Sequence, residues 1–228
     1  MKKTYQSFIK DNLVYLAVIL FIAIISANNS FASPVCGDLA TGYGPFDYTD
    51  PQDLKKLPVV ETYHFTPKVE QLRGGESSYI WDDLDYTLRA FPNHHRALYA
   101  FVRYEIKMRQ KSQQKNNYYK PPMTKYGYPA SAECYFDRAL RWRPNDPTVR
   151  MLYGLYLHRK DDLRKALDQY RISEKIQPNV ADLQYNLGLL YFDLKNYKLA
   201  KEHAKKAYQL GYPLPGLRKK LASIGQWP

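Results

Sequence analysis

The stretch YNLGLLYFDLKNYKLAKEHAKKAYQLG, residues 185–211, decides the fold class of this 228-residue chain. Its apolar residues recur every three or four positions on both sides of a short polar break, which predicts two amphipathic helices joined by a turn. In the first helix Gly188 has no side chain and lets a neighbouring helix approach closely. In the second, Ala200, Ala204 and Ala207 form a thin seam against the first. The stretch therefore predicts a helix hairpin held together by small residues.

The hairpin pattern repeats at an interval of 34 residues. Gly188 falls on Gly154 one interval earlier, and Ala200 falls on Ala166, which itself falls on Ala132. Self-similarity at a fixed period of this size indicates stacked helical hairpins, each of which buries its apolar face against the next. The alternative is an ordinary helical bundle in which the spacing is accidental.

This pattern resembles the tetratricopeptide repeat (TPR) family. The residues that carry the resemblance are Leu187, Gly188, Tyr191, Ala200, Ala204 and Ala207 in one unit, and Tyr153, Gly154, Ala166, Tyr170 and Pro178 in the unit before it. The earlier unit departs from the family at Leu157, where an aromatic residue is preferred, and at Ser173, where alanine is preferred. The resemblance implies an all-α, right-handed stack of antiparallel helix hairpins, with about three units, the first degenerate and interrupted by an insertion.

The chain outside the repeats divides into several expected segments. Expected helices precede the clear repeats at 77–92, 94–110 and 130–144, and Val59–Phe65 is expected to be a short extended segment. Thr66 and Pro67 are a typical helix cap and first position. The expected domains are a signal peptide at 1–32, an irregular N-terminal arm at 33–75 and a TPR-like helical domain at 76–228. Within the helical domain we expect an insertion loop at 111–129, the clearest repeats at 147–180 and 181–213, and a capping helix at 214–224.

The N-terminus indicates export. Three lysines in the first ten residues precede an uncharged apolar run over residues 13–27, and Ser30 and Ala32 supply the small residues of a cleavage site. This is the pattern of a secretory signal peptide, with cleavage near Ala32 and a bacterial periplasm as the destination. The alternative is an uncleaved membrane anchor, although the apolar run is shorter than the roughly 20 residues that a spanning helix needs.

The formal net charge of +12 favours an acidic partner. An exported protein does not meet nucleic acid, so the expected partners are another envelope protein or peptide segment, or an anionic polymer or membrane surface.

The chain has two cysteines, Cys36 and Cys134, and an oxidising compartment favours a disulfide between them. Such a bond would tie the N-terminal arm to the helical body. A lipid-modified Cys36 is the alternative, and Pro34 and Val35 fit the required preceding residues poorly.

By resemblance to the family, ligands meet the inward-facing positions of the first helix in each hairpin. Carried over to this sequence, the positions are Met151, Leu155, His158, Arg159, Tyr185, Leu189, Phe192 and Asp193. They suit an apolar peptide segment in a groove, oriented by Arg159 and Asp193. They equally suit burial beneath the N-terminal arm or the insertion.

The insertion between residues 111 and 129 holds four lysines, four tyrosines and no acidic residue. Basic and aromatic side chains on a loop can recognise an anionic partner, and a solvated connection is the simpler interpretation. The candidate anion-binding residues are Lys111, Lys115, Tyr118, Tyr119, Lys120 and Lys125.

Nothing in the sequence points to catalysis, a metal or a cofactor. The five histidines lack metal-ligand spacing, and the acidic residues of 82–85 lie at the expected start of a helix, where they complement its dipole. We therefore expect an exported adaptor that mediates protein–protein interaction in a cell-envelope assembly. The alternative is recognition of an anionic envelope glycan or lipid head group through the basic, tyrosine-rich insertion, and an enzyme or enzyme subunit is a third interpretation without a nominated residue.

Overall fold

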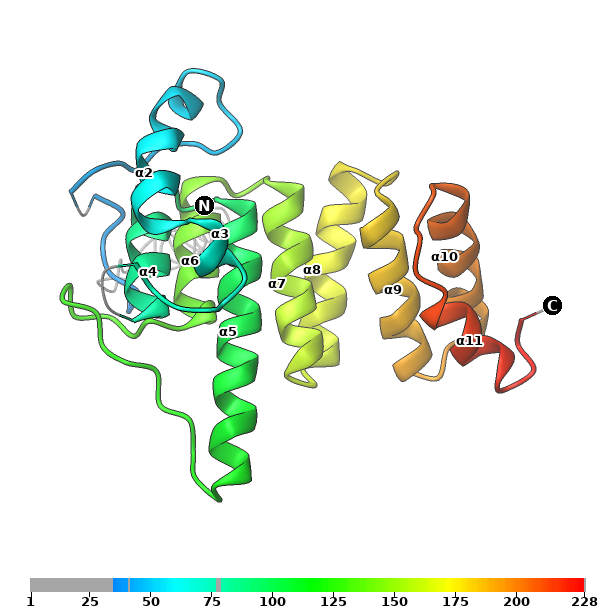
Figure 1. The fold of residues 1–228 in the computed structure, drawn as a ribbon. Coiled ribbons are helices and arrows are strands. Elements are labelled where there is room, and N and C mark those ends of the chain that lie inside the picture. The colour runs from blue at the N-terminus through cyan, green and yellow to red at the C-terminus, as the bar shows by residue number, and fades with distance from the viewer. Residues whose placement is uncertain (1–34, 41, 77–78, 228) are drawn as a thin grey trace, which may run out of the picture. The chain divides into compact units, whose positions relative to one another are not determined.

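Helices α4 to α10 stand side by side in a row (Figure 1). The computed structural model describes residues 35–40, 42–76 and 79–227, and Cys36–Pro228 form one compact unit. The expected signal peptide, residues 1–32, lies outside the described residues. Within them the regular structure is helical apart from one isolated bridge between Met123 and Pro129, and no helix there is both long enough and apolar enough to cross a bilayer.

Two regular hairpins occupy the C-terminal half. Helix α7 (Pro147–Arg159) packs against α8 (Leu163–Ile176), and α9 (Ala181–Asp193) packs against α10 (Tyr197–Gln209). The second helix of each pair is capped by a side-chain oxygen, from Asp162 and Asn196 respectively. The predicted stack of antiparallel hairpins is confirmed.

Small residues determine how closely these helices pack, as the sequence indicated. A Cβ atom on Gly154 would lie 2.6 Å from the ring of Tyr170, and one on Gly188 would overlap the side chain of Leu217. Ala200, together with the rest of the alanine seam, is fully buried. The helices therefore approach at distances that only glycine and alanine permit.

The first unit consists of α5 (His95–Gln114) and α6 (Ala132–Trp142), preceded by α4 (Ile80–Ala90). The buried carboxylate of Glu105 fixes its register. This carboxylate accepts hydrogen bonds from the Ala132 backbone N–H at 2.6 Å and the Tyr156 hydroxyl at 2.8 Å, and it pairs with Arg109. One side chain of α5 thereby holds the start of α6 and the middle of α7.

The N-terminal arm contains more helix than the sequence indicated. It forms a 3₁₀ turn, η1 (Asp53–Lys56), followed by α2 (Leu57–His64) and α3 (Pro67–Glu70). The expected extended segment at Val59–Phe65 is wrong, because residues 59–64 belong to a helix that begins at Leu57, has Pro58 in its first turn and buries Val60 beside Phe91. The predicted cap of the next helix is confirmed: the Thr66 hydroxyl accepts the Val69 N–H.

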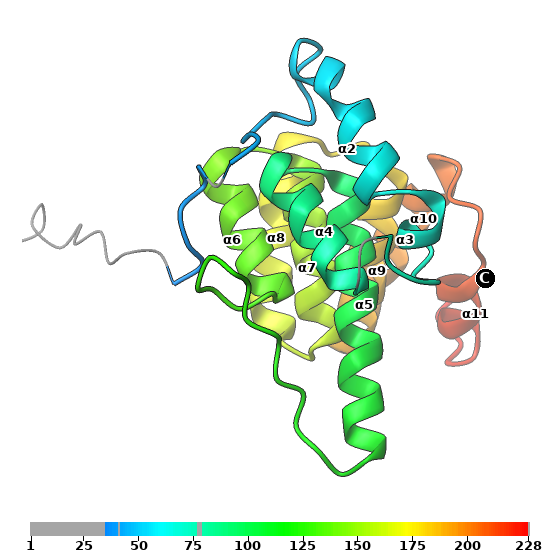
Figure 2. The same ribbon diagram turned by 60° about the vertical axis from the view of Figure 1, so that its left-hand side comes forward.

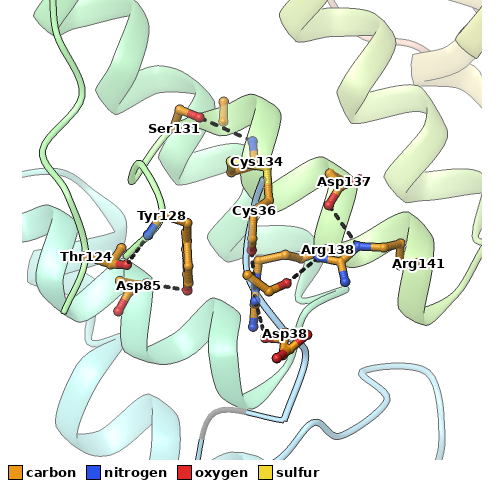
Figure 3. Close-up of a disulfide and its surroundings, with 12 residues drawn as sticks. Cys36, Asp38, Asp85, Thr124, Tyr128, Ser131, Cys134, Asp137, Arg138 and Arg141 are labelled. Carbon is orange, nitrogen blue, oxygen red and sulfur yellow. Dashed lines mark hydrogen bonds and ion pairs between the residues drawn. A yellow bond between two sulfur atoms is a disulfide. The ribbon is translucent and has the colours of Figure 1, made fainter. Parts of the chain in front are cut away.

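The start of the arm is fastened to α6 (Figure 3). Cys36 and Cys134 lie at disulfide distance, with their sulfur atoms 2.11 Å apart, as predicted. Beside them the buried guanidinium of Arg138 donates to the carbonyl oxygens of Cys36 and Asp38 and lies 4.9 Å from the ring of Tyr128. Burial lowers the pKa of Arg138.

The C-terminal end of the stack is covered by α11 (Gly216–Ala222), the expected capping helix. Leu217 and Leu221 are fully buried, and the helix packs on both α9 and α10. This covers apolar surface that the last hairpin would otherwise expose.

Candidate binding groove along the first helices of the hairpins

A groove of about 680 Å³ runs along α5, α7 and α9. Its volume is in the range of ligand-binding clefts. Leu155 and Leu189 are central to it, and they also border an adjoining hollow of about 480 Å³. Among the described residues, neither the N-terminal arm nor the insertion loop contributes a lining side chain, so the groove is open rather than filled by either segment.

The structure brings most of the eight predicted inward-facing residues to the groove or to the hollow beside it. Five of the eight line the groove, namely Met151, Leu155, Arg159, Tyr185 and Leu189. His158 and Asp193 line the adjoining hollow. Phe192 lines neither; its ring packs against Tyr197 and lies under the ammonium group of Lys220.

One end of the groove is rich in tyrosine. Tyr185 stacks on Tyr212 with ring centroids 3.9 Å apart, and its hydroxyl accepts the Leu217 N–H at 3.1 Å. Burial, reinforced by the neighbouring Tyr185 and Asp182, raises the pKa of Tyr212 to about 12. Tyr99 on α5 completes this end and is 45% exposed. This end therefore offers uncharged aromatic surface with polar tips.

The remaining charged groups of the groove are mainly cationic. Arg103 and Lys107 project from α5 and Arg159 from α7, against the single carboxylate of Asp182. In the part of the chain that the structure describes, none of the three cations forms an ion pair. The Arg103 guanidinium donates to the backbone carbonyl of Glu70, and the Glu70 carboxylate interacts with it only at longer range.

Asp193 is less available to a ligand than expected. Its carboxylate pairs with the His158 imidazole at 2.9 Å and with the Lys220 ammonium at 3.5 Å. Of the two residues expected to orient a bound segment, Arg159 is the one whose charge is not already paired within the described residues.

The insertion presents its lysines to solvent. Lys111 lies in the last turn of α5, and Lys115, Lys120 and Lys125 are exposed in the connection that follows. Between Ile106 and Ala132 the sequence has no acidic residue that could neutralise them.

The tyrosines of the insertion are mostly engaged by the protein. Tyr118 is 81% exposed. The hydroxyl of Tyr119, in contrast, is buried without a hydrogen-bond partner among the described residues, and burial raises its pKa. Tyr126 accepts a hydrogen bond from Arg89, and the buried Tyr128 donates to Asp85. The loop therefore offers several lysines and two exposed tyrosines, Tyr118 and Tyr126, and the second of these is already engaged by Arg89.

Sequence reasoning missed the α5 wall and the C-terminal end of the groove. The residues concerned are Tyr99, Arg103, Ile106 and Lys107 on α5, and Tyr212 and Leu214 after α10. The register of the first unit was open, so its inward face could not be identified. The spacing of Tyr99, Arg103 and Lys107 by four residues was the available signal, since such residues share a helix face.

A second cavity of about 440 Å³ lies between α2, α4 and the insertion. Its buried carboxylate, Asp85, accepts the Tyr135 hydroxyl and pairs with Arg89, each at 2.8 Å. Burial raises the pKa of Asp82 at its edge, helped by the nearby Asp85. Over the described ranges no cluster of three or more His, Cys, Asp or Glu side chains could hold a metal ion, and the histidines have protein partners.

Comparison with known proteins gives a match to one family. Residues 181–210, which include all of α9 and α10, match the family model described as "Tetratricopeptide repeat". No curated protein matches the sequence.

Several solved structures are similar in fold. YrrB, described as "a TPR protein with an unusual peptide-binding site", is 23% identical over 64% of each chain, with a TM-score of 0.41. Pseudomonas aeruginosa pilF is 17% identical over 75% of this chain and 66% of its own, with a TM-score of 0.48. MamA is 16% identical over 76% and 83%, with a TM-score of 0.44. This chain spans just under two thirds of YrrB and pilF, and at these identities and TM-scores no function follows from the likeness.

Proposed function

Because this chain contains a tetratricopeptide repeat at residues 181–210 in a stack of helix hairpins, we propose that it is an exported adaptor that binds an extended segment of another envelope protein in its groove and has no catalytic activity of its own. Repeat stacks of this kind present extended surfaces to partners.

The observation that carries the proposal is the composition of the groove. Apolar side chains at its centre, Leu155 and Leu189, are flanked by tyrosines at one end and by an unpaired Arg159 at the other. A protein segment supplies both apolar side chains and directional polar groups, which matches this surface better than an entirely polar ligand.

Site-specific photocrosslinking in the native envelope tests the proposal. A photoreactive amino acid at Asn186, which lines the groove and the adjoining hollow, should capture one envelope protein. The same probe at Ile172 on α8, which is 38% exposed and lines no cavity described above, should not capture it.

A second change in the same chain makes the result specific. Leu189→Gln places an amide at the apolar centre of the groove and should abolish capture from position 186 without unfolding the chain, as checked by circular dichroism. Capture that survives Leu189→Gln, or that is equal from both probe positions, would contradict the groove as the binding surface.

Recognition of an anionic glycan or lipid head group is the second candidate function. The exposed lysines of the insertion support it, since no acidic residue lies between Ile106 and Ala132. The burial of Tyr128 and of the Tyr119 hydroxyl removes part of the aromatic surface that this candidate also needs.

A further inference from the structure

We propose that the segment bound in the groove carries a run of acidic residues that leaves the groove along the projecting end of α5. This inference rests on the proposed adaptor function and adds the chemical class of the partner: an apolar stretch joined to an acidic one.

A stripe of cations on α5 connects the groove to the projecting end. Arg103, Lys107 and Lys111 are spaced by four residues and so lie on one helix face, and Lys115 follows at the cap of the helix. The first two line the groove. We call these four residues the α5 stripe.

The stripe continues past the other helices that line the groove. Helix α5 has 20 residues, whereas α7 and α9 have 13 each. Figures 1 and 2 both show its C-terminal part extending beyond the ends of these neighbours. Seven additional residues at 1.5 Å each make about 10 Å of helix, enough to contact two or three residues of an extended partner.

No carboxylate in the described part of the chain forms a direct ion pair with the stripe, although Glu70 interacts with Arg103 at longer range. Glu105 on the same helix is buried and occupied by Arg109, Tyr156 and the start of α6. The side chain of Glu70, whose carbonyl meets Arg103, is itself held by Arg96. Like charges four residues apart destabilise a helix, and an acidic partner would relieve that repulsion.

The continuity between groove and stripe favours a peptide over the other anionic partners. A bilayer surface is flat and cannot reach Lys107 inside the groove and Lys115 beyond it at the same time. A polyanionic glycan gains nothing from the apolar centre at Leu155 and Leu189. A flexible chain with an apolar part and an acidic part can satisfy both regions.

Selection from a displayed library of random 16-residue peptides against the full chain tests the inference. Enriched peptides should contain an apolar or aromatic cluster with an acidic run on one side of it. One enriched peptide and its counterpart with every Glu and Asp replaced by Gln and Asn are then measured by fluorescence anisotropy.

The variant Lys111→Ala/Lys115→Ala removes the part of the stripe outside the groove. It should weaken binding of the acidic peptide about tenfold, the size expected for the loss of two exposed ion pairs, and leave binding of the amide counterpart unchanged. Lys198→Ala/Lys205→Ala on α10 removes the same charge at two exposed residues that do not line the groove. It should change the affinity of neither the acidic peptide nor its amide counterpart. Salt should weaken the acidic peptide more than the amide form.

The outcomes separate this inference from the adaptor function. Enrichment of apolar peptides without acidic residues, whose binding is weakened by Leu189→Gln, would contradict the proposed acidic run but support the groove as the binding surface. Acidic peptides insensitive to Leu189→Gln, or no enrichment, would overturn both. If the chain binds phosphatidylglycerol vesicles through the α5 stripe while Lys111→Ala/Lys115→Ala leaves peptide affinity unchanged, the projecting end of α5 binds a lipid surface and the inference is wrong.

Discussion

His94 shows how much one buried side chain contributes to the start of a helix. It is fully buried and caps α5, because its Nδ1 accepts the Ala97 N–H at 3.1 Å while its Nε2 lies 3.1 Å from a Glu61 carboxylate oxygen. An accepting Nδ1 carries no proton, so the neutral imidazole donates from Nε2. Burial lowers the pKa of His94, and Glu61 opposes that shift.

The pH dependence of stability should report this histidine. Below the ordinary pKa of 6.5 the unfolded chain takes up a proton at His94 that the folded chain takes up only at lower pH, so the free energy of unfolding falls as the pH falls below 6.5. Urea unfolding at pH 7 and pH 5 should show this loss, and it should be smaller in His94→Asn, which keeps a capping side chain but does not titrate. Burial also lowers the pKa of His203, which contributes with the same sign, so part of the loss remains. An unchanged difference between the two pH values would exclude His94 as a cause.

The two helix glycines give a paired prediction. Tyr170 and Leu217 are both fully buried. Gly154→Ala places a methyl group against the rigid ring of Tyr170, whereas Gly188→Ala meets the end of the Leu217 side chain, which can rotate, and comes within 3.4 Å of the Ala200 and Ala204 backbone. Overpacking costs about 1–3 kcal/mol, and alanine returns up to about 1 kcal/mol of helix propensity. Gly154→Ala should therefore lower the free energy of unfolding by about 1–2 kcal/mol, and Gly188→Ala by less. Chemical denaturation of both variants checks the order, and equal or reversed losses would contradict it.

At the scale of single residues, the packing role of small residues could be predicted from the sequence, whereas the burial of charged residues could not. Gly154, Gly188 and the alanine seam were predictable, because a small residue at helical spacing has few reasons other than close packing. Glu105 and Arg138 were not, because a charged residue is usually solvated and only the fold brings their partners together. Their partners come from α6 and α7 in one case and from the arm in the other.

Among the elements, α11 is the one whose contribution to stability is simplest to test. Leu221 is fully buried at the end of the stack, so Leu221→Ala should lower the free energy of unfolding by about 2–5 kcal/mol through lost burial and the cavity that remains. Leu214→Ala, at a position 58% exposed, should cost less than about 0.5 kcal/mol. Thermal or urea unfolding of the two variants gives the comparison. A small loss in Leu221→Ala would mean that the last hairpin does not need its cap.

Regular helices could be predicted from the sequence, whereas the elements shaped by tertiary contacts could not. The helices of the two clear repeats follow from apolar spacing. Helix α2 was missed, because its β-branched residues suit a strand locally and only packing of Val60 beside Phe91 selects the helix. The sequence predicts a loop after Gln110, because the polar residues there offer no apolar face to bury, whereas α5 continues to Gln114.

For the whole molecule, the bond between Cys36 and Cys134 closes a loop with a sequence separation of 98. In the chain-entropy model such a loop contributes about 4–5 kcal/mol, and measured values often fall below that. The variant Cys36→Ser/Cys134→Ser should lower the free energy of unfolding by up to this amount while the repeats remain helical. Urea unfolding measures the loss, and mapping of non-reduced peptides from exported protein identifies the bond. Two alkylatable thiols in native protein would show that the bond does not form.

About half of the candidate site could be predicted from the sequence, and the arrangement of the repeats in the whole molecule explains why. The contributions of α7 and α9 follow from one repeat period, which transfers an inward position from one unit to the next. The α5 wall belongs to a unit whose insertion breaks that period, so Arg103 and Lys107 could be assigned to the groove only once α5 and α7 were placed side by side.

The closed loop also governs how this molecule would carry mechanical load. A pull applied between residue 35 and the C-terminus would pass directly across the two sulfur atoms, and the chain enclosed between them would bear no tension. The extension released on unfolding would then be shorter by roughly 330 Å, at about 3.4 Å for each of the 98 shielded steps. Only the chain after Cys134, which comprises the rest of α6, the two regular hairpins and α11, would lengthen under force. The part of the chain between the two cysteines would keep its length.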